Sequence, residues 1–394
     1  MNNILEQWRH KKSWGLTFPF CPIYVSKKTG EKDIFLTNLL SKEDRLTLSL
    51  RDSGFNEIGV DWLSGEIPSE YQYLTQPQAR IEGIAPEHLA SLLLQRIYQY
   101  FISVWDSSKF HIVLTGGGLD SRILCYVLTL LREKLGPNWI GDIHFRCCEP
   151  ESPIFRKLME RQQWPEGCYS VYKEGRIMEK DYFEDLYNFE DNVNAFHLSH
   201  LNFYHDLEKY LNLKFSDVQV VSGNGGGEIF DYPSRMSQID PNNPFANLKK
   251  YFEVGRFNFL YDYIKWGDIL LPYLSYSYLD LAFRTPKKLM DQSIKVDGVS
   301  GLDFNIKKVS TGLMRIEMLK LLGDDLPYYQ GHFYNTKISE SKRAYVKDAW
   351  LKSRFYNDFK DVKEVSEATP QTMNWQNLGL DNQLYSLATV YQGI

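Results

Sequence analysis

The chain has 394 residues and a formal net charge of -5, and 43% of its residues are hydrophobic. This is an ordinary globular composition, and the acidic balance predicts no basic field for nucleic acid. No apolar run reaches the ~18 residues that a membrane span needs, and the first residues lack the apolar core of a signal peptide. The five cysteines, without paired CxxC motifs, fit a reducing compartment. We therefore expect a soluble, cytoplasmic protein without nucleic-acid or membrane partners.

Residues 1 to 85 have a different pattern from the rest of the chain. Short apolar pieces such as CPIYVS, DIFLTNLL and RLTLSL are separated by turn residues such as Lys28-Thr29-Gly30, as is typical of short strands. The polar stretch 76–80 is a candidate junction. We expect a small β-rich domain over residues 1–85 and a second domain over residues 86–394.

From Pro86 onward, helical and strand patterns alternate. The predicted order is helix 87–98, strand 110–114, helix 121–132, strand 140–145, helix 154–163 and strand 218–221. This alternation is typical of an α/β fold, in which crossover helices connect a parallel sheet. After about residue 245 the periodicity is mainly helical, over 248–254, 257–264, 276–283, 313–322 and 342–352.

A glycine-rich turn follows the predicted strand 110–114 and precedes a helix. Successive backbone N–H groups in such a turn form an anion nest, and the helix N-terminus adds partial positive charge. Glycine also permits positive φ and close approach of a ligand to the backbone. The alternative is a plain strand-to-helix turn, in which Asp120-Ser121 caps the helix. The candidate phosphate-binding residues are Leu114, Thr115, Gly116, Gly117, Gly118, Asp120 and Ser121, and Asp120 is also the candidate Mg²⁺ ligand.

The segment 117–121, Gly-Gly-Leu-Asp-Ser, resembles the SGGLDS pyrophosphate loop of the N-type ATP pyrophosphatases. The branch that it most resembles is the synthetase domain of asparagine synthetase and β-lactam synthetase. The serine of the family loop falls on Gly116 here, or else the loop has gained a glycine after Thr115. The resemblance spans residues 86 to 345 and implies an adenine-nucleotide α-hydrolase-like fold.

A second glycine turn, about 100 residues later, resembles the SGDGADELF segment of the same family. It implies nucleotide-binding roles for Ser222, Gly223, Asn224 and Gly225, and a catalytic role for Glu228. The family aspartate, which is a presumed Mg²⁺ ligand, falls on Gly227. The site therefore has fewer carboxylates than its relatives.

A third segment completes the resemblance. Residues 270–274, Leu-Leu-Pro-Tyr-Leu, are similar to the PFLD segment of the family, with Ser275 in place of its aspartate. The family also has an essential lysine after a Leu-Pro pair. Lys337 is the best match to this catalytic lysine, and Lys342 is the second choice.

The resemblance implies an AMP-forming ligase that uses ATP and Mg²⁺ to join a small-molecule or peptide carboxylate to an amine. Glutamine-dependent relatives have a nucleophilic cysteine at position 2, where this chain has Asn2. Residues 1–85 are too few for a complete glutaminase domain and would be a reduced remnant of one. The amine would then be ammonia, part of the substrate or a second molecule. A homodimer, or a partner protein that delivers the substrate, fits this picture.

Two alternatives stay open on the residues. Cys147 or Cys148 could carry persulfide sulfur, as in sulfur-transferring relatives of the loop. The absence of an acidic residue at 227 would also fit a nucleotide-binding pseudoenzyme that has lost its chemistry.

Overall fold

The computed structural model describes fourteen stretches of the chain, and the following paragraphs concern these alone. They are residues 23–33, 58–61, 69–148, 151–172, 213, 217–230, 245, 268–290, 292–300, 305–329, 348, 351–352, 357 and 360.

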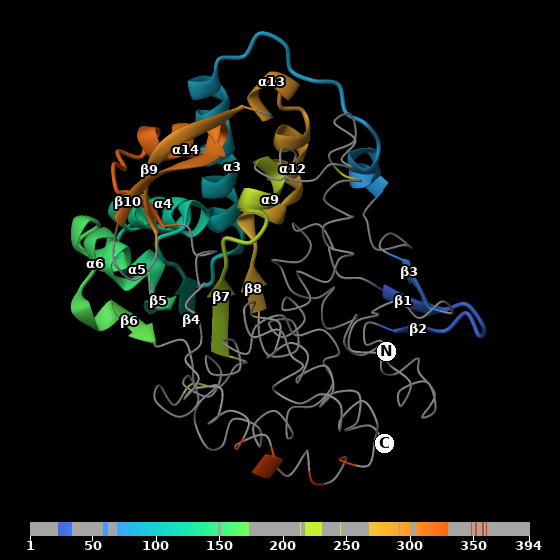
Figure 1. The fold of residues 1–394 in the computed structure, drawn as a ribbon, viewed down its shortest axis with the longest axis horizontal. Helices are drawn as coiled ribbons and strands as arrows, with labels where there is room; N and C mark the ends of the chain where they lie inside the picture. Colours follow the sequence, from blue (N-terminus) through green and yellow to red (C-terminus); the bar gives the residue numbers. More distant parts are fainter. Residues whose placement is uncertain are drawn as a thin grey trace.

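A five-stranded parallel sheet forms the centre of the described structure (Figure 1). Its strand order is β6-β5-β4-β7-β8, and every neighbouring pair is parallel. The three central residues of β4 and all four residues of β7 are buried, as expected for strands covered on both faces. The α/β prediction is confirmed. The strands are β4 (Phe110–Leu114), β5 (Ile143–Cys148), β6 (Tyr169–Tyr172), β7 (Val218–Val221) and β8 (Asp268–Leu270).

Helices pack around this sheet, and α3, α4 and α14 contact one another. Their buried apolar residues join the sheet in one core. Most predicted elements are present with shifted ends, whereas β4, β7 and α12 begin and end as predicted. The helices are α3 (Pro86–Val104), α4 (Leu119–Leu135), α5 (Pro137–Ile140), α6 (Ser152–Arg161), α9 (Gly226–Phe230), α12 (Tyr276–Phe283), α13 (Lys287–Met290) and α14 (Leu313–Leu321), with 3₁₀ turns η3 (Ser69–Thr75), η4 (Glu166–Cys168) and η8 (Pro272–Leu274).

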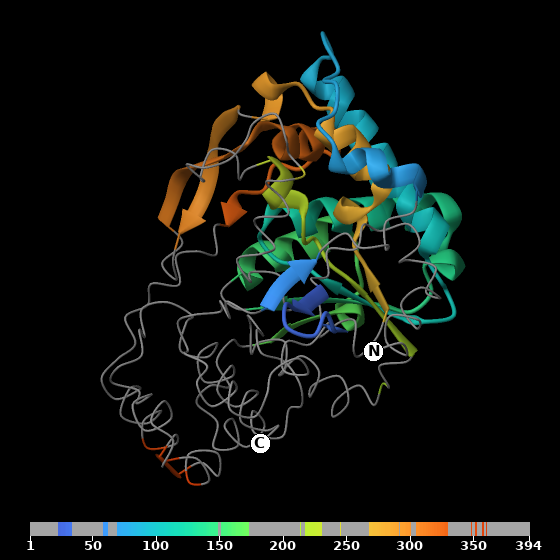
Figure 2. The same cartoon turned by 90° about the vertical axis from the view of Figure 1, so that its right-hand side faces the viewer.

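The sequence patterns missed several strands. In the part with mainly helical periodicity, β9 (Ser293–Ser300) and β10 (Asn305–Gly312) pair as the two antiparallel strands of a hairpin. Strand β11 (Tyr328–Tyr329) adds to β9 in parallel. Figure 2 shows this hairpin apart from the central sheet. The strand predicted over 140–145 was also too early, because Ile140 closes helix α5. The predicted helices 248–254 and 257–264, and most of 342–352, lie outside the described residues.

The N-terminal part contributes a small antiparallel sheet with order β2-β1-β3. These strands are β1 (Ile23–Ser26), β2 (Lys32–Asp33) and β3 (Ile58–Asp61). The predicted turn lies between β1 and β2, where Gly30 has φ +72°. A separate domain over 1–85 stays a prediction.

The predicted junction is held by hydrogen bonds to the following part of the chain. Arg80 Nη1 donates to the carbonyl oxygens of Phe283 at 2.9 Å and Thr285 at 2.8 Å. The Tyr71 and Tyr276 rings stack with their centroids 3.9 Å apart. Residues 69–85 therefore pack against α12 and the turn after it. Within the described residues, no helix combines the length and the apolar character needed to cross a membrane.

Candidate anion-binding site

Both glycine turns lie at one edge of the central sheet. Strands β4 and β7 are parallel neighbours, so the turns after Leu114 and after Val221 leave the sheet at their carboxyl ends. Each turn is joined to the next strand along by a backbone hydrogen bond, from Thr115 N to Arg146 O at 3.0 Å and from Ser222 N to Leu270 O at 3.1 Å. Both turns therefore lie at the carboxyl edge of the sheet, as expected. Open α/β sheets bind their ligands at this edge.

The two turns touch each other. A β-carbon added at Gly223 would lie 2.9 Å from the amide nitrogen of Ser121, and one added at Gly226 would lie 2.6 Å from Asp120 Oδ1. Gly225 has φ +93°, in the left-handed region that favours glycine. The second turn therefore needs glycine for backbone contact with the start of α4.

The first turn uses its glycines differently. None of Gly116, Gly117 and Gly118 has a positive φ, so this turn does not use the left-handed backbone that glycine permits. Gly118 precedes α4 with φ -69° and ψ 152° and, as a glycine, gives the helix no side-chain cap. A β-carbon at Gly118 would meet nothing within 4 Å. Asp120 and Ser121 lie in the first turn of α4 and not at the residue before it, so they do not occupy the cap position, and the turn leaves open space beside Gly118.

A carboxyl group from a neighbouring loop lies against this turn. Glu151 Oε2 accepts a hydrogen bond from the amide of Gly117 at 2.6 Å. Burial raises the pKa of the Glu151 carboxyl, and the backbone N–H groups of Gly117 and Gly118 oppose that rise. Glu151 follows β5, whose carboxyl end lies beside that of β4. The Glu151 carboxyl oxygen, which accepts N–H hydrogen bonds as a phosphate oxygen does, thus contacts the turn that was predicted to form an anion nest.

Asp120 is held by a buried arginine. Arg315 Nη1 lies 2.8 Å from Asp120 Oδ2 and 3.1 Å from Oδ1, while Arg315 Nη2 donates to Thr311 Oγ1 at 2.9 Å. Only 4% of the Arg315 side chain and 23% of the Asp120 side chain are exposed. Burial raises the pKa of the Asp120 carboxyl, and Arg315 together with the Gly227 amide opposes that rise.

These contacts bear on the predicted Mg²⁺ ligand. A carboxylate offers about four lone-pair sites, and at Asp120 Arg315 and the Gly227 amide compete for them. Among the described residues, no group of three or more His, Cys, Asp or Glu side chains could hold a metal. The metal role of Asp120 stays a prediction.

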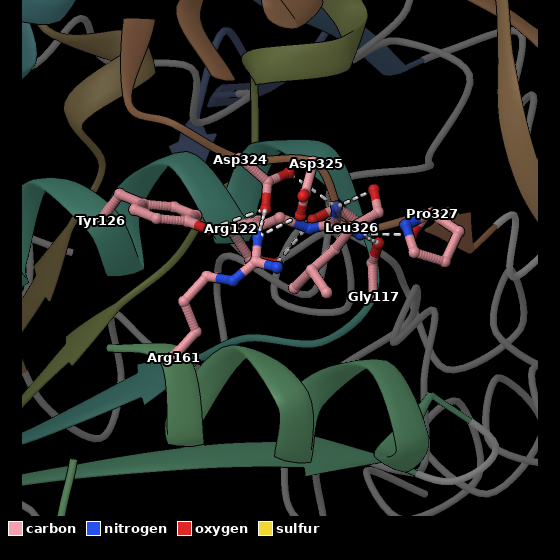
Figure 3. A network of polar contacts seen from close by, with 10 residues as sticks. Gly117, Arg122, Tyr126, Arg161, Asp324, Asp325, Leu326 and Pro327 are labelled. Atoms are coloured by element: carbon pink, nitrogen blue, oxygen red, sulfur yellow. Dashed lines mark hydrogen bonds and ion pairs between the residues drawn. The ribbon is translucent and has the colours of Figure 1, made fainter. Parts of the chain in front are cut away.

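A second arginine fixes the opposite side of the first turn (Figure 3). Arg122 is fully buried, and its Nη2 donates to Gly117 O at 2.5 Å. Its Nη1 forms an ion pair with Asp324 Oδ2 at 2.9 Å. The same guanidinium donates to the carbonyl oxygens of Leu326 and Pro327, both at 2.9 Å. The first turn is thereby connected to the Leu-Pro pair that was used to place the catalytic lysine.

The Arg122 network extends outward through Asp324. Tyr126 Oη donates to Asp324 Oδ1 at 2.8 Å, and Arg161 lies 3.7 Å from the same oxygen. Arg161 also pairs with the exposed Asp325 at 2.5 Å. The ion pairs therefore run from Arg122, which is fully buried, to Asp325, which is exposed to solvent.

The remaining predicted site residues have varied positions. Leu114 ends β4, and Thr115 is buried, with no hydrogen-bond partner for its Oγ1 among the described residues. Ser222 Oγ accepts from Asn224 Nδ2 at 2.6 Å, so the Asn224 side chain is used within its own turn. Ser121 lies at the start of α4.

The side chains of the other predicted catalytic residues lie outside the described part of the chain. Glu228 belongs to α9, but its side chain lies outside the description, as does that of Cys148. Lys337 and Lys342 both lie in the undescribed range 330–347. Their catalytic roles stay predictions.

Sequence reasoning missed Glu151, Arg122 and Asp324, and it gave Arg315 no role in the site. Glu151 is 34 residues from Gly117, and Arg315 is 195 residues from Asp120. No local motif contains these pairs. Only the position of Glu151 after a predicted strand, at the carboxyl edge of a parallel sheet, could have indicated it.

Comparison with known proteins adds no assignment. No protein-family description matches the chain, and no curated protein matches it. The resemblance to asparagine synthetase and its relatives therefore rests on the three sequence segments.

Proposed function

We propose that this protein is an ATP-dependent synthetase that activates a carboxylate as an acyl-adenylate and transfers the acyl group to an amine. One observation carries the proposal: the glycine turn after β4 donates the Gly117 N–H to a carboxyl oxygen of Glu151. An oxygen-binding turn beside a helix N-terminus, at the carboxyl edge of a parallel sheet, suits the phosphates of a nucleotide.

The chemistry has two balanced steps. A carboxylate oxygen attacks the α-phosphorus of ATP, the bond from that phosphorus to the bridging oxygen breaks, and pyrophosphate leaves. An amine nitrogen then attacks the acyl carbon, AMP leaves and the amine loses a proton. Mg²⁺ bound with the nucleotide would neutralise part of the polyphosphate charge. The protein must stabilise the charge that develops on the departing pyrophosphate.

The described residues divide these tasks. The Gly117 and Gly118 amides would donate to pyrophosphate oxygens, with the partial positive charge of the α4 N-terminus behind them. Arg122 holds the Gly117 carbonyl, which keeps the turn in one conformation. Arg315 orients the Asp120 carboxylate toward the second glycine turn. The sequence resemblance adds Lys337 for the α-phosphate and Glu228 for the acyl-adenylate.

A substrate screen tests the proposal. The protein is incubated with ATP, Mg²⁺ and pools of small molecules or peptides, and mass spectrometry follows mass changes together with AMP and pyrophosphate. We expect one acid and one amine to give AMP, pyrophosphate and an amide in equal amounts. Nucleotide-dependent thermal stabilisation without pyrophosphate release from any pool would instead support a pseudoenzyme.

The predicted lysine provides a matched pair of variants. Lys337→Met should lower kcat strongly and leave ATP affinity largely intact, because an ammonium at the α-phosphate favours the transition state over bound ATP. Lys342→Met should do much less. The reverse result would move the catalytic role to Lys342, and two silent variants would remove it from both.

The sulfur-transfer alternative has less support from the described cysteines. Cys147 is completely buried within β5, whereas a persulfide carrier has to reach its acceptor. Thiol alkylation of the active protein is the direct test. Loss of turnover after alkylation would favour a sulfur carrier over the synthetase.

A further inference from the structure

The Glu151 side chain occupies an unusual place for a residue that precedes a helix. Glu151 stands immediately before α6, with φ -79° and ψ -7°, yet its side chain does not cap that helix. The side chain instead crosses to the turn after β4, where Oε2 accepts the Gly117 amide at 2.6 Å. The carboxyl group therefore stabilises a different loop from its own.

The carboxyl group also fills the space beside Gly116. A β-carbon added at Gly116 would collide with Glu151 Oε2 and come within 3.0 Å of its Cδ. The colliding atoms are the far end of a flexible side chain, with rotatable bonds that could carry it elsewhere. Glu151 thus uses both the hydrogen-bond donor and the free volume of the first glycine turn.

We propose that Glu151 is an internal competitor for this turn, which the phosphate of an incoming nucleotide must displace. The inference rests on the proposed function, since it assumes that the turn binds phosphate. A carboxylate and a phosphate use the same N–H donors. They cannot both accept the hydrogen bond of the Gly117 amide at full strength.

Internal competition has a quantitative consequence. The apparent Kd of a ligand rises by the inverse of the fraction of protein whose site is free, so a turn filled about 90% of the time binds about tenfold more weakly. The apparent affinity of every anion that binds at the turn falls by the same factor. Weakly binding anions then fail to occupy the site, whereas a nucleotide with further contacts retains useful affinity. Glu151 would act in this way as a selectivity residue.

Calorimetric titration with inorganic pyrophosphate, in EDTA so that no metal can bridge to the carboxylate, tests this role on the full chain. We expect Glu151→Ala to lower the Kd by about tenfold or more. Glu151→Gln keeps the shape and a neutral acceptor oxygen, so it should fall between Ala and the native residue. Glu160→Gln is the matched control, because Glu160 is exposed on α6, the helix that follows Glu151, and the Kd of this variant for pyrophosphate should not change.

A second variant tests whether the carboxyl group and the phosphate share one position. Gly116→Ala places a methyl group where Oε2 now lies, so it blocks that position for the carboxyl oxygen and for a phosphate oxygen alike. Its Kd for pyrophosphate should therefore rise, and adding Glu151→Ala should not restore the affinity, because the methyl group still fills the space.

The outcomes separate the two proposals. If the native chain and the variants all bind pyrophosphate with equal Kd, or if Glu151→Ala binds more weakly, Glu151 is not a competitor, while the phosphate site stands. If no variant and no native protein binds pyrophosphate, the proposed nucleotide function fails, and the role of Glu151 fails with it.

Discussion

The two glycine turns end neighbouring strands of one sheet, but different interactions hold them. In the first turn, side chains bind the backbone: Arg122 takes the carbonyl of Gly117 and Glu151 takes its amide. In the second turn, glycine is needed for close backbone contact, since Gly223 lies against the amide of Ser121. Similar runs of glycine thus serve two purposes: in the first turn they leave the backbone accessible to side chains from elsewhere in the chain, and in the second they permit dense packing.

Asp120 is the residue through which the two turns meet, and its substitution should have the largest effect on activity. Asp120→Asn keeps the size and removes the charge that faces Arg315 and the Gly227 amide. We expect pyrophosphate release to slow by roughly two to four orders of magnitude. Asp280→Asn, the same change on α12 at a partly exposed position, is the control. A near-normal rate in Asp120→Asn would show that another residue carries this role.

Arg122→Met should give the largest loss of stability. It removes the nearest cation of the buried Asp324, at 2.9 Å, and the side-chain donor to the carbonyl oxygen of Gly117 (Figure 3). Removal of one member of a buried ion pair costs about 3–5 kcal/mol. Arg161→Met breaks the outer, exposed pair with Asp325 and should cost less than about 1 kcal/mol. Urea unfolding measures both, and equal losses would mean that the network does not hold the first turn.

Beneath the turns, β4 and β7 share a buried polar contact, and the burial of its histidine should make the stability of the fold depend on pH. His111 Nε2 lies 2.8 Å from Gln219 Oε1, and burial lowers the pKa of His111 from 6.5 to about 4. The folded state thus binds fewer protons than the unfolded state between these values. Stability should be complete above pH 6.5 and fall as the pH drops toward 4, by about 3 kcal/mol at about 1.36 kcal/mol per pKa unit.

Urea unfolding from pH 8 to pH 4 measures this loss. His111→Phe keeps an aromatic ring against Trp105, which stacks on His111 at 3.6 Å, and removes the titrating group. Its unfolding free energy should vary less with pH over this window than that of the native chain. An unchanged slope would assign the acid sensitivity to other groups.

The smallest expected effect compares alanine in the two turns directly. Gly223→Ala would bring a β-carbon to 2.9 Å from the Ser121 amide nitrogen, and overpacking of this kind costs about 1–3 kcal/mol. Gly118→Ala has open space and an ordinary φ, so its stability should change little. If the first turn binds phosphate, Gly118→Ala should still weaken pyrophosphate binding. Equal unfolding free energies for the two variants would remove the distinction between the turns.

The sequence predicted the framework of the site better than its contacts. Strands β4 and β7 were located correctly because short apolar runs end at glycines, and α12 because its apolar spacing is helical. The β9–β10 hairpin was missed because the region around it has helical periodicity. The carboxyl edge could be predicted from parallel pairing, since the ends of parallel strands coincide.

The partners of the glycine turns could not be predicted in the same way. Arg122 and Asp324 are 202 residues apart, and their pairing depends on how α14 packs on α4. A local motif reports the residues of one turn. It does not report which distant side chains will neutralise, hold or obstruct that turn after folding.

The hydrogen bonds of Arg80 matter for how this protein can be divided. Arg80 donates to two carbonyl oxygens just after α12, and Tyr73 Oη bonds Asp280 Oδ1 at 3.0 Å. A chain shortened to begin at Pro86 would lose all three bonds and uncover α12. Any exchange of the N-terminal part, by recombination in nature or by fusion in the laboratory, should therefore join ahead of Ser69, so that residues 69–85 are inherited with α12.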